Sequence, residues 1–250
     1  AWLSESSYPC NTTIHQYENR SIKISKNMRL AKYKHLGIMA AAFIVVAYGM
    51  TSCDAHEAID KNIYVGHVLC SDGHVASYEE CQKQGKEPVA VVFYTSRETT
   101  EDGDGLAIGL REIPAVAFSD TLGVNQGTST DTDSKCGNAN TFALYSNNKA
   151  ESPLAEEVFS VWRYGQSAYI PSVAEMRLLH ASLDIVNPMI VRCGGQPVHR
   201  QDEGCWYWTS SEVSGQASAK AWLYSLGTGT MQETPKTESH PARCIITLHR

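Results

Sequence analysis

The chain has 250 residues, with 21 Lys and Arg against 27 Asp and Glu, which gives a formal net charge of −6. Hydrophobic residues make up 42% and charged residues 19%, so the chain can build a packed core and wholesale disorder is excluded. An acidic balance without a basic run argues against a protein that binds nucleic acid by neutralising phosphates.

The first feature along the chain is an apolar run, residues 36–50, that contains no charged side chain. A membrane-spanning helix needs about 20 apolar residues, so this run is short for a transmembrane segment. Basic residues stand just before it and small residues just after it, as in a secretory signal peptide. We therefore expect a signal peptide at residues 28–52, with a transmembrane anchor or a buried helix as the alternatives.

The end of this segment, residues 48–53 (YGMTSC), resembles the relaxed lipobox of Bacteroides-like bacterial lipoproteins. The resemblance implies cleavage before Cys53 and attachment of lipid to its sulfur. Each buried CH₂ of an acyl chain contributes about 0.8 kcal/mol to such an anchor. The expected location is the bacterial outer membrane or cell surface, with residues 53–62 as a tether.

Residues 1–27 carry scattered polar residues without periodicity. We interpret them as a disordered upstream extension from a misplaced start codon, with a genuine disordered leader as the alternative. Without residues 1–52 the chain keeps 198 residues and a net charge of −10, which suits one domain at residues 63–250.

Short β-branched and aromatic runs predict strands, separated by turn signals. The predicted strands cover residues 63–70, 89–95, 106–110, 205–209, 221–226, 230–234 and 242–249. Asp-Gly pairs at 101–105 predict a hairpin turn. A calcium loop is less favoured there, because Leu106 and Ile108 stand where further oxygen ligands would be needed.

Capping signals predict the helices. Ser77 and Glu80 form a capping box that opens a short helix. A longer helix begins at Pro153 and ends at Gly165, and another begins after Ser172 and stops at Asn187-Pro188.

Residues 140–145 are a further candidate for a short helix, after a polar loop at 119–140. Helices in the middle of the chain and a β-rich end predict an α+β domain.

Four segments of the second half carry a family resemblance. They are residues 169–179 (YIPSVAEMRLL), 206–212 (WYWTSSE), 221–229 (AWLYSLGTG) and Arg243. Their order and spacing resemble the Fibrobacter succinogenes major paralogous domain and the related C-terminal domain of Legionella collagen-like proteins. The resemblance covers about residues 165–250. It implies a C-type-lectin-like fold, with two main helices packed on a twisted antiparallel sheet and long loops.

The resemblance also implies a disulfide pattern. It suggests pairs between Cys136 and Cys244, between Cys193 and Cys205, and between Cys70 and Cys81. From the residues alone, export favours disulfides, but six cysteines allow 15 pairings, and buried thiols remain an alternative.

No catalytic motif stands out, whether G-x-S-x-G, H-E-x-x-H, a P-loop or G-x-G-x-x-G. We therefore expect no enzyme, no cofactor and no metal. His199, Asp202 and Glu203 have the side chains of metal ligands, but a solvated polar loop is favoured.

Alternation along the predicted strand 205–209 places Trp206 and Trp208 on one face and Tyr207 on the other.

The leading hypothesis is a cell-surface lipoprotein with a non-catalytic domain that binds a glycan or a protein through loops 119–140, 193–205 and 213–219. The candidate binding residues are Trp206, Tyr207, Glu212, His199, Arg200, Asp202 and Glu203. Core packing is the competing role for the aromatic residues, and is favoured for Trp208 and Trp222. The alternatives are a structural accessory subunit of a fimbria or adhesin, and an extracellular enzyme acting on a polymer through Glu203 or Glu212.

Overall fold

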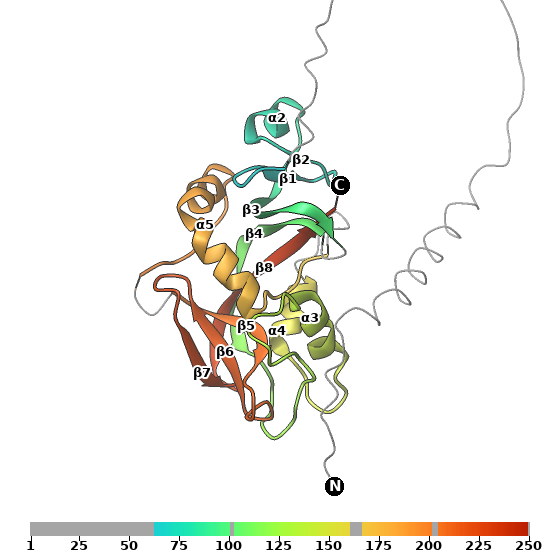
Figure 1. Cartoon of the computed structure of the whole chain (residues 1–250), viewed down its shortest axis with the longest axis vertical. Helices are drawn as coiled ribbons and strands as arrows, with labels where there is room; N and C mark the ends of the chain where they lie inside the picture. The colour runs from blue at the N-terminus through green and yellow to red at the C-terminus, as the bar shows by residue number, and fades with distance from the viewer. Residues whose placement is uncertain (1–62, 101–102, 161–166, 202–204, 250) are drawn as a thin grey trace, which may run out of the picture. The chain divides into compact units, whose positions relative to one another are not determined.

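The computed structural model describes residues 63–100, 103–160, 167–201 and 205–249 (Figure 1). The expected signal peptide, the lipidation candidate Cys53 and the tether lie outside the described residues. Within the described part of the chain, no helix is long and apolar enough to cross a membrane.

The larger sheet has five strands in the order β2-β1-β3-β4-β8, and every neighbouring pair is antiparallel. The strands are β1 (Val68–Cys70), β2 (Val75–Ala76), β3 (Pro88–Thr100), β4 (Gly103–Ala117) and β8 (Ser239–Leu248). The predicted hairpin is confirmed, since β3 pairs with β4 up to Thr100 and Gly103. The last strand of the chain therefore lies in the same sheet as the first.

The first strand is shorter than the sequence predicts. A turn precedes it, in which the His67 N–H donates to the Tyr64 carbonyl at 3.0 Å and Gly66 takes a φ of 91°. That positive φ suits glycine, so the chain turns here and β1 begins only at Val68.

The smaller sheet is an antiparallel meander of β5 (Trp206–Glu212), β6 (Lys220–Ser225) and β7 (Met231–Pro235). All three strands overlap the predicted ones, and β5 continues past its predicted end at Thr209 to Glu212. Three helices lie between β4 and β5 in the sequence: α3 (Gly137–Ser146), α4 (Pro153–Ser160) and α5 (Val173–Arg192). A fourth, α2 (Tyr78–Lys83), follows β2. The α+β class is thus confirmed.

The predicted helix starts are confirmed by their caps. Ser172 with Glu175 makes a complete capping box, whereas at α2 only half of the predicted box forms. There the Ser77 side chain accepts the Glu80 N–H at 3.1 Å, but the Glu80 carboxylate accepts from the Gln84 side chain. The predicted end of α4 at Gly165 lies outside the described residues.

The predicted stop of α5 at Asn187-Pro188 is wrong, because the helix continues to Arg192. A proline lacks the N–H that would bond the carbonyl four residues earlier, here that of Asp184. Both residues are exposed, so water can solvate that carbonyl. Continuing the helix buries Ile190 completely, which favours the longer form.

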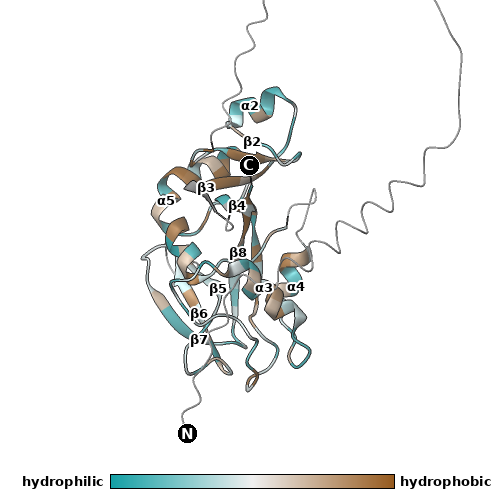
Figure 2. Ribbon diagram, turned by 45° about the vertical axis from the view of Figure 1, so that its right-hand side comes forward, coloured by the Kyte–Doolittle hydropathy of each residue, from teal (hydrophilic) through white to brown (hydrophobic). Residues whose placement is uncertain are grey.

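Apolar side chains form two clusters, one on each side of the larger sheet. One includes residues of α4 with Phe118 and Trp208, and the other packs α5 against β3. Figure 2 shows brown apolar residues along the strands of the larger sheet and teal polar residues on α2. The predicted alternation in β5 is confirmed, since Trp206 and Trp208 contact the first cluster and Tyr207 the second.

Candidate functional site

Three loops far apart in the sequence meet at one end of the domain, the lower end in Figure 1. We call residues 119–128, 147–151 and 213–219 the loop end. The Gly123 N–H donates to the Ser218 carbonyl at 2.7 Å, and the Asp120 N–H donates to the Glu151 carbonyl at 3.0 Å. Two of the three loops expected to carry recognition are therefore brought together, whereas the loop at 193–201 packs elsewhere, against β4.

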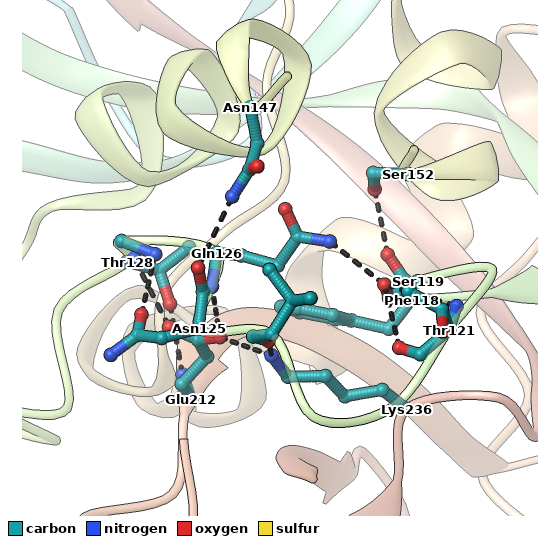
Figure 3. A network of polar contacts seen from close by, with 12 residues as sticks. Phe118, Ser119, Thr121, Asn125, Gln126, Thr128, Asn147, Ser152, Glu212 and Lys236 are labelled. Carbon is teal, nitrogen blue, oxygen red and sulfur yellow. Dashed lines mark hydrogen bonds and ion pairs between the residues drawn. The ribbon is translucent and has the colours of Figure 1, made fainter. Parts of the chain in front are cut away.

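A buried ion pair lies beneath the loop end (Figure 3). Glu212 is the last residue of β5 and Lys236 directly follows β7, and both side chains have 0% exposure. The Lys236 ammonium contacts the Glu212 carboxylate and also donates to the Val124 carbonyl at 3.0 Å. The pair therefore joins the smaller sheet to the 119–128 loop.

Glu212 also binds the backbone of that loop. Its two carboxylate oxygens accept the N–H groups of Gln126 at 2.8 Å and of Thr128 at 3.2 Å. The Glu212 N–H in turn donates to the Thr128 hydroxyl at 3.1 Å. The loop is fixed by hydrogen bonds to a charged group, which are stronger than neutral ones.

The charges in this network are expensive to bury. Burial lowers the pKa of Lys236, while its hydrogen bond and charge interaction with Glu212 oppose that shift. A buried pair stays ionised only when both groups have partners, and removing one partner typically costs about 3–5 kcal/mol. The stability of the loop end therefore depends on both residues together.

The surface of the loop end has a pocket of about 370 Å³, formed by polar residues of two loops. It is lined by Asp120, Asn147, Asn148, Lys149, Ala150 and Glu151. The Glu151 N–H donates to Asp120 Oδ1 at 3.1 Å, and the Asn147 amide donates to the Asn125 carbonyl at 3.2 Å. These bonds hold the two walls together, while Asn148 and Lys149 remain exposed.

Glu212, a candidate binding residue from the sequence, is completely buried and so offers no surface to a ligand. Tyr207 is also fully buried, and its hydroxyl accepts the His199 N–H at 3.0 Å and donates to Glu112 at 2.9 Å. Burial raises the pKa of Tyr207, the largest of several effects on it. Tyr207 therefore fixes the 193–201 loop on β4, and its burial leaves no exposed surface for the predicted contact with a ligand.

The other candidate binding residues do not form one site. Trp206 is half-buried against the first apolar cluster, and Trp208 is buried in it, as the core-packing role predicts. His199 and Arg200 are exposed, and Arg200 forms an ion pair with Asp184 at 2.5 Å. Asp202 and Glu203 lie outside the described residues.

The disulfide pattern implied by the family resemblance is not supported. All six cysteines from Cys70 onward are thiols, without a disulfide among them. The sulfur of Cys136 lies 2.6 Å from the Ser134 hydroxyl, and that of Cys205 lies 3.2 Å from the Ser225 hydroxyl. Neither contact involves the partner that the pattern assigns.

The sequence interpretation did not identify Lys236, Thr128 or the residues that line the pocket. Lys236 stands in a turn between two strands, where a lysine is normally solvated. The 147–151 loop is a polar linker between two helices, without a motif. The one feature of the sequence that indicates a functional site here is the length of the 119–140 loop, since long loops in compact domains tend to be functional.

Nowhere in the described ranges do three or more His, Cys, Asp or Glu side chains gather in a way that could hold a metal ion. Neither the comparison with protein-family models nor the search of curated proteins finds a match for the chain.

Proposed function

We propose that this chain is a lipid-anchored surface protein whose domain recognises a glycan at the loop end without catalysis. The observation that carries the proposal is the polar pocket between Asp120 and residues 147–151, beside a loop whose residues 124–128 are fixed by the Glu212–Lys236 pair.

The pocket suits a hydroxylated ligand. Its volume of about 370 Å³ is within the usual range for small-ligand sites. Amide, carboxylate and ammonium side chains offer both donors and acceptors, which sugar hydroxyls need. Tyr145, at the end of α3, is 57% exposed and its ring packs against that of Phe159, so it does not line the pocket itself.

The buried Glu212–Lys236 pair also bears on the affinity of the loop end for a ligand. A loop that is already ordered loses less conformational entropy when it binds. The buried pair and its backbone hydrogen bonds order residues 124–128 before any ligand arrives. Recognition by loops on a fixed scaffold is also the arrangement that binding domains commonly use.

Catalysis is not part of the proposal. Glu212, one of the two carboxylates suggested for an enzyme, has no access to a polymer in solvent and is neutralised by Lys236. A general acid or base must lie within hydrogen-bond reach of its substrate.

The finer fold assignment is also a proposal. A C-type-lectin-like arrangement is supported by the first and last strands sharing a sheet, by the separate small sheet and by the long irregular loop between β4 and α3.

The lipid anchor is tested apart from the binding. We expect incorporation of a labelled fatty acid into the full chain expressed in a Bacteroides-like host, and its loss in Cys53→Ala. Labelling that persists in Cys53→Ala would place the lipid elsewhere, and absence of label in both would exclude the anchor.

A glycan array tests the recognition. The chain from residue 54 onward is expected to bind a defined set of glycans. Lys149→Ala and Asn148→Ala should each weaken that binding by about tenfold, because each removes one hydrogen bond to the ligand. Lys83→Ala, an exposed lysine on α2, is the matched control. Equal binding by all variants would contradict the site, and no binding by the unaltered chain would contradict glycan recognition.

A further inference from the structure

A second cavity, of about 400 Å³, shares no lining residue with the pocket at the loop end. Its walls come from the start of β3, from β4 and β8, from the ends of α4 and α5, and from Ala168. The interior is mainly apolar and includes Val89, Leu110, Ala168, Cys244 and Ile246. Its volume and apolar walls are those of a small-ligand site.

The cavity opens where β3 and β4 separate. Ala90 and Gly109 are the last residues that pair in this direction. Pro88 has no N–H to donate to β4, and the Leu110 carbonyl accepts the Gln196 N–H at 2.8 Å instead. The separation of the strands is therefore part of the fold, because the carbonyl on β4 has its partner in another loop.

Three glycines line the cavity, and two of them have a reason in the backbone. Gly194 has a φ of 73° just after α5, and a Cβ at Gly195 would lie 2.8 Å from the Leu110 carbonyl oxygen. Gly109 has neither reason. Its φ lies outside the left-handed region, and the nearest atom to an added Cβ would be the Cys244 carbonyl oxygen, at an ordinary 3.5 Å. Glycine inside a strand often marks the close approach of a ligand, so Gly109 points to an occupant of this cavity.

The mouth of the cavity carries one charge of each sign. Glu87 directly precedes β3 and Arg111 lies on β4, and both residues are exposed. Arg111 forms no ion pair with another described residue. A guanidinium group binds a carboxylate through two parallel hydrogen bonds, and a carboxylate accepts hydrogen bonds from an ammonium group. The two side chains therefore match the two charged groups of a free amino acid.

We propose that this cavity binds a free amino acid with a large apolar side chain. The α-carboxylate pairs with Arg111, the α-ammonium group pairs with Glu87, and the side chain lies in the space beside Gly109. The proposal does not depend on glycan recognition, because the two cavities share no residue. Charge pairs at an exposed mouth contribute little, so burial of the side chain supplies most of the affinity.

Saturation-transfer NMR on the full chain tests the site, with L-phenylalanine as the probe. The ring protons should receive more saturation than the α-proton, because the ring lies inside the cavity. 3-Phenylpropionate lacks the ammonium group and phenethylamine lacks the carboxylate, so each should bind about two- to fivefold more weakly. Absence of transfer to phenylalanine would overturn the proposal, and equal binding of all three probes would overturn the two charge pairs.

Gly109→Val separates filling of the cavity from damage to the fold. Valine suits a strand, and the added Cβ makes only an ordinary contact, so the variant should resist urea at least as well as the unaltered chain. Its side chain occupies the cavity, so binding of phenylalanine should fall by about tenfold or more. A folded variant that binds phenylalanine as before would contradict the site.

Arg111→Gln tests the charged mouth on an exposed position, where the fold is not at risk. Binding of phenylalanine should weaken by about two- to fivefold, whereas binding of phenethylamine, which has no carboxylate, should not change. Arg200→Gln, at an exposed arginine outside the cavity lining, is the matched control and should leave both unchanged. The same effect of Arg111→Gln on both probes would overturn the assigned orientation.

Cys193 reports occupancy independently, because it lines the cavity and is half-exposed. Burial raises its pKa to about 11, so its reaction with iodoacetamide is followed at alkaline pH, where more thiolate is present. Alkylation should slow several-fold at saturating phenylalanine, and this protection should be absent in Gly109→Val. Alkylation that phenylalanine leaves unchanged would place the bound amino acid outside this cavity and overturn the proposal.

Discussion

Two of the lysine–carboxylate pairs in the described residues differ sharply in their surroundings. Glu212 and Lys236, under the loop end, are both completely buried. Asp72 and Lys86, on either side of α2, have side chains that are 35% and 27% exposed. The two pairs therefore allow a completely buried pair to be compared with a partly exposed one.

The two pairs differ in the expected loss of stability when one of the two charged side chains is removed. At the exposed pair, the hydrogen bond from Lys86 lowers the pKa of Asp72 to about 2, but water can replace either partner. At the buried pair, no water replaces a missing charge, and the backbone of residues 126–128 is bound to the same carboxylate. We infer that charge orders the loop end, whereas the apolar packing of α2 against the larger sheet matters more for residues 71–87.

The largest effect is expected for Lys236→Met, which leaves the Glu212 carboxylate buried without its cation. The free energy of unfolding should fall by about 3–5 kcal/mol in urea denaturation. The double variant Lys236→Met/Glu212→Gln should recover part of this loss, because the neutral amide needs no cation. A loss below about 1 kcal/mol in the single variant, the size expected for an exposed pair, would remove the distinction between the two pairs.

A smaller effect is expected for Thr128→Val. The Glu212 N–H loses its acceptor in a buried position, and such a loss typically costs about 1–3 kcal/mol. Hydrogen exchange at residues 124–128 should accelerate by a corresponding factor, while exchange in β3 is unchanged. Thr237→Val, at an exposed turn position next to Lys236, is the control and should leave both quantities unaltered.

Lys86→Met should change the stability far less than Lys236→Met, because the pair with Asp72 is partly exposed and water can solvate the remaining charge. The same urea denaturation measures it, with the unaltered chain as reference. A loss as large as that of Lys236→Met would mean that burial does not separate the two pairs.

The smallest effect is a pH dependence at Asp72. Its folded pKa of about 2 lies below the ordinary value of 3.8, so the ionised carboxylate stabilises the folded chain above pH 3.8. That contribution is lost as the pH falls from 3.8 toward 2. The stability difference between the unaltered chain and Asp72→Asn should therefore shrink over this range, by less than about 1 kcal/mol given the exposure of the pair. A difference that grows on acidification would contradict the sign.

The sequence predicts the elements of this domain better than its site. Strand alternation and capping boxes depend on neighbouring residues, so β5, β6, β7 and the start of α5 fall where expected. Pro188 shows where local rules fail, since burial of Ile190 outweighs the effect of the proline.

The candidate site was harder to predict because its contacts are distant in the chain. Glu212 ends a strand, where a carboxylate normally faces solvent. Its partners are Lys236, 24 residues later, and the backbone of Gln126, 86 residues earlier. Nothing in the local pattern around Glu212 indicates either of them.

The buried pair holds the 119–128 loop by its main chain. Lys236 binds a carbonyl and Glu212 binds two N–H groups, and every residue type except proline supplies both. An exposed side chain such as that of Leu122 can therefore be replaced without loss of these anchors. Such exposed positions of the loop can be varied to select or engineer new binding specificities, on a backbone that the buried pair keeps in place.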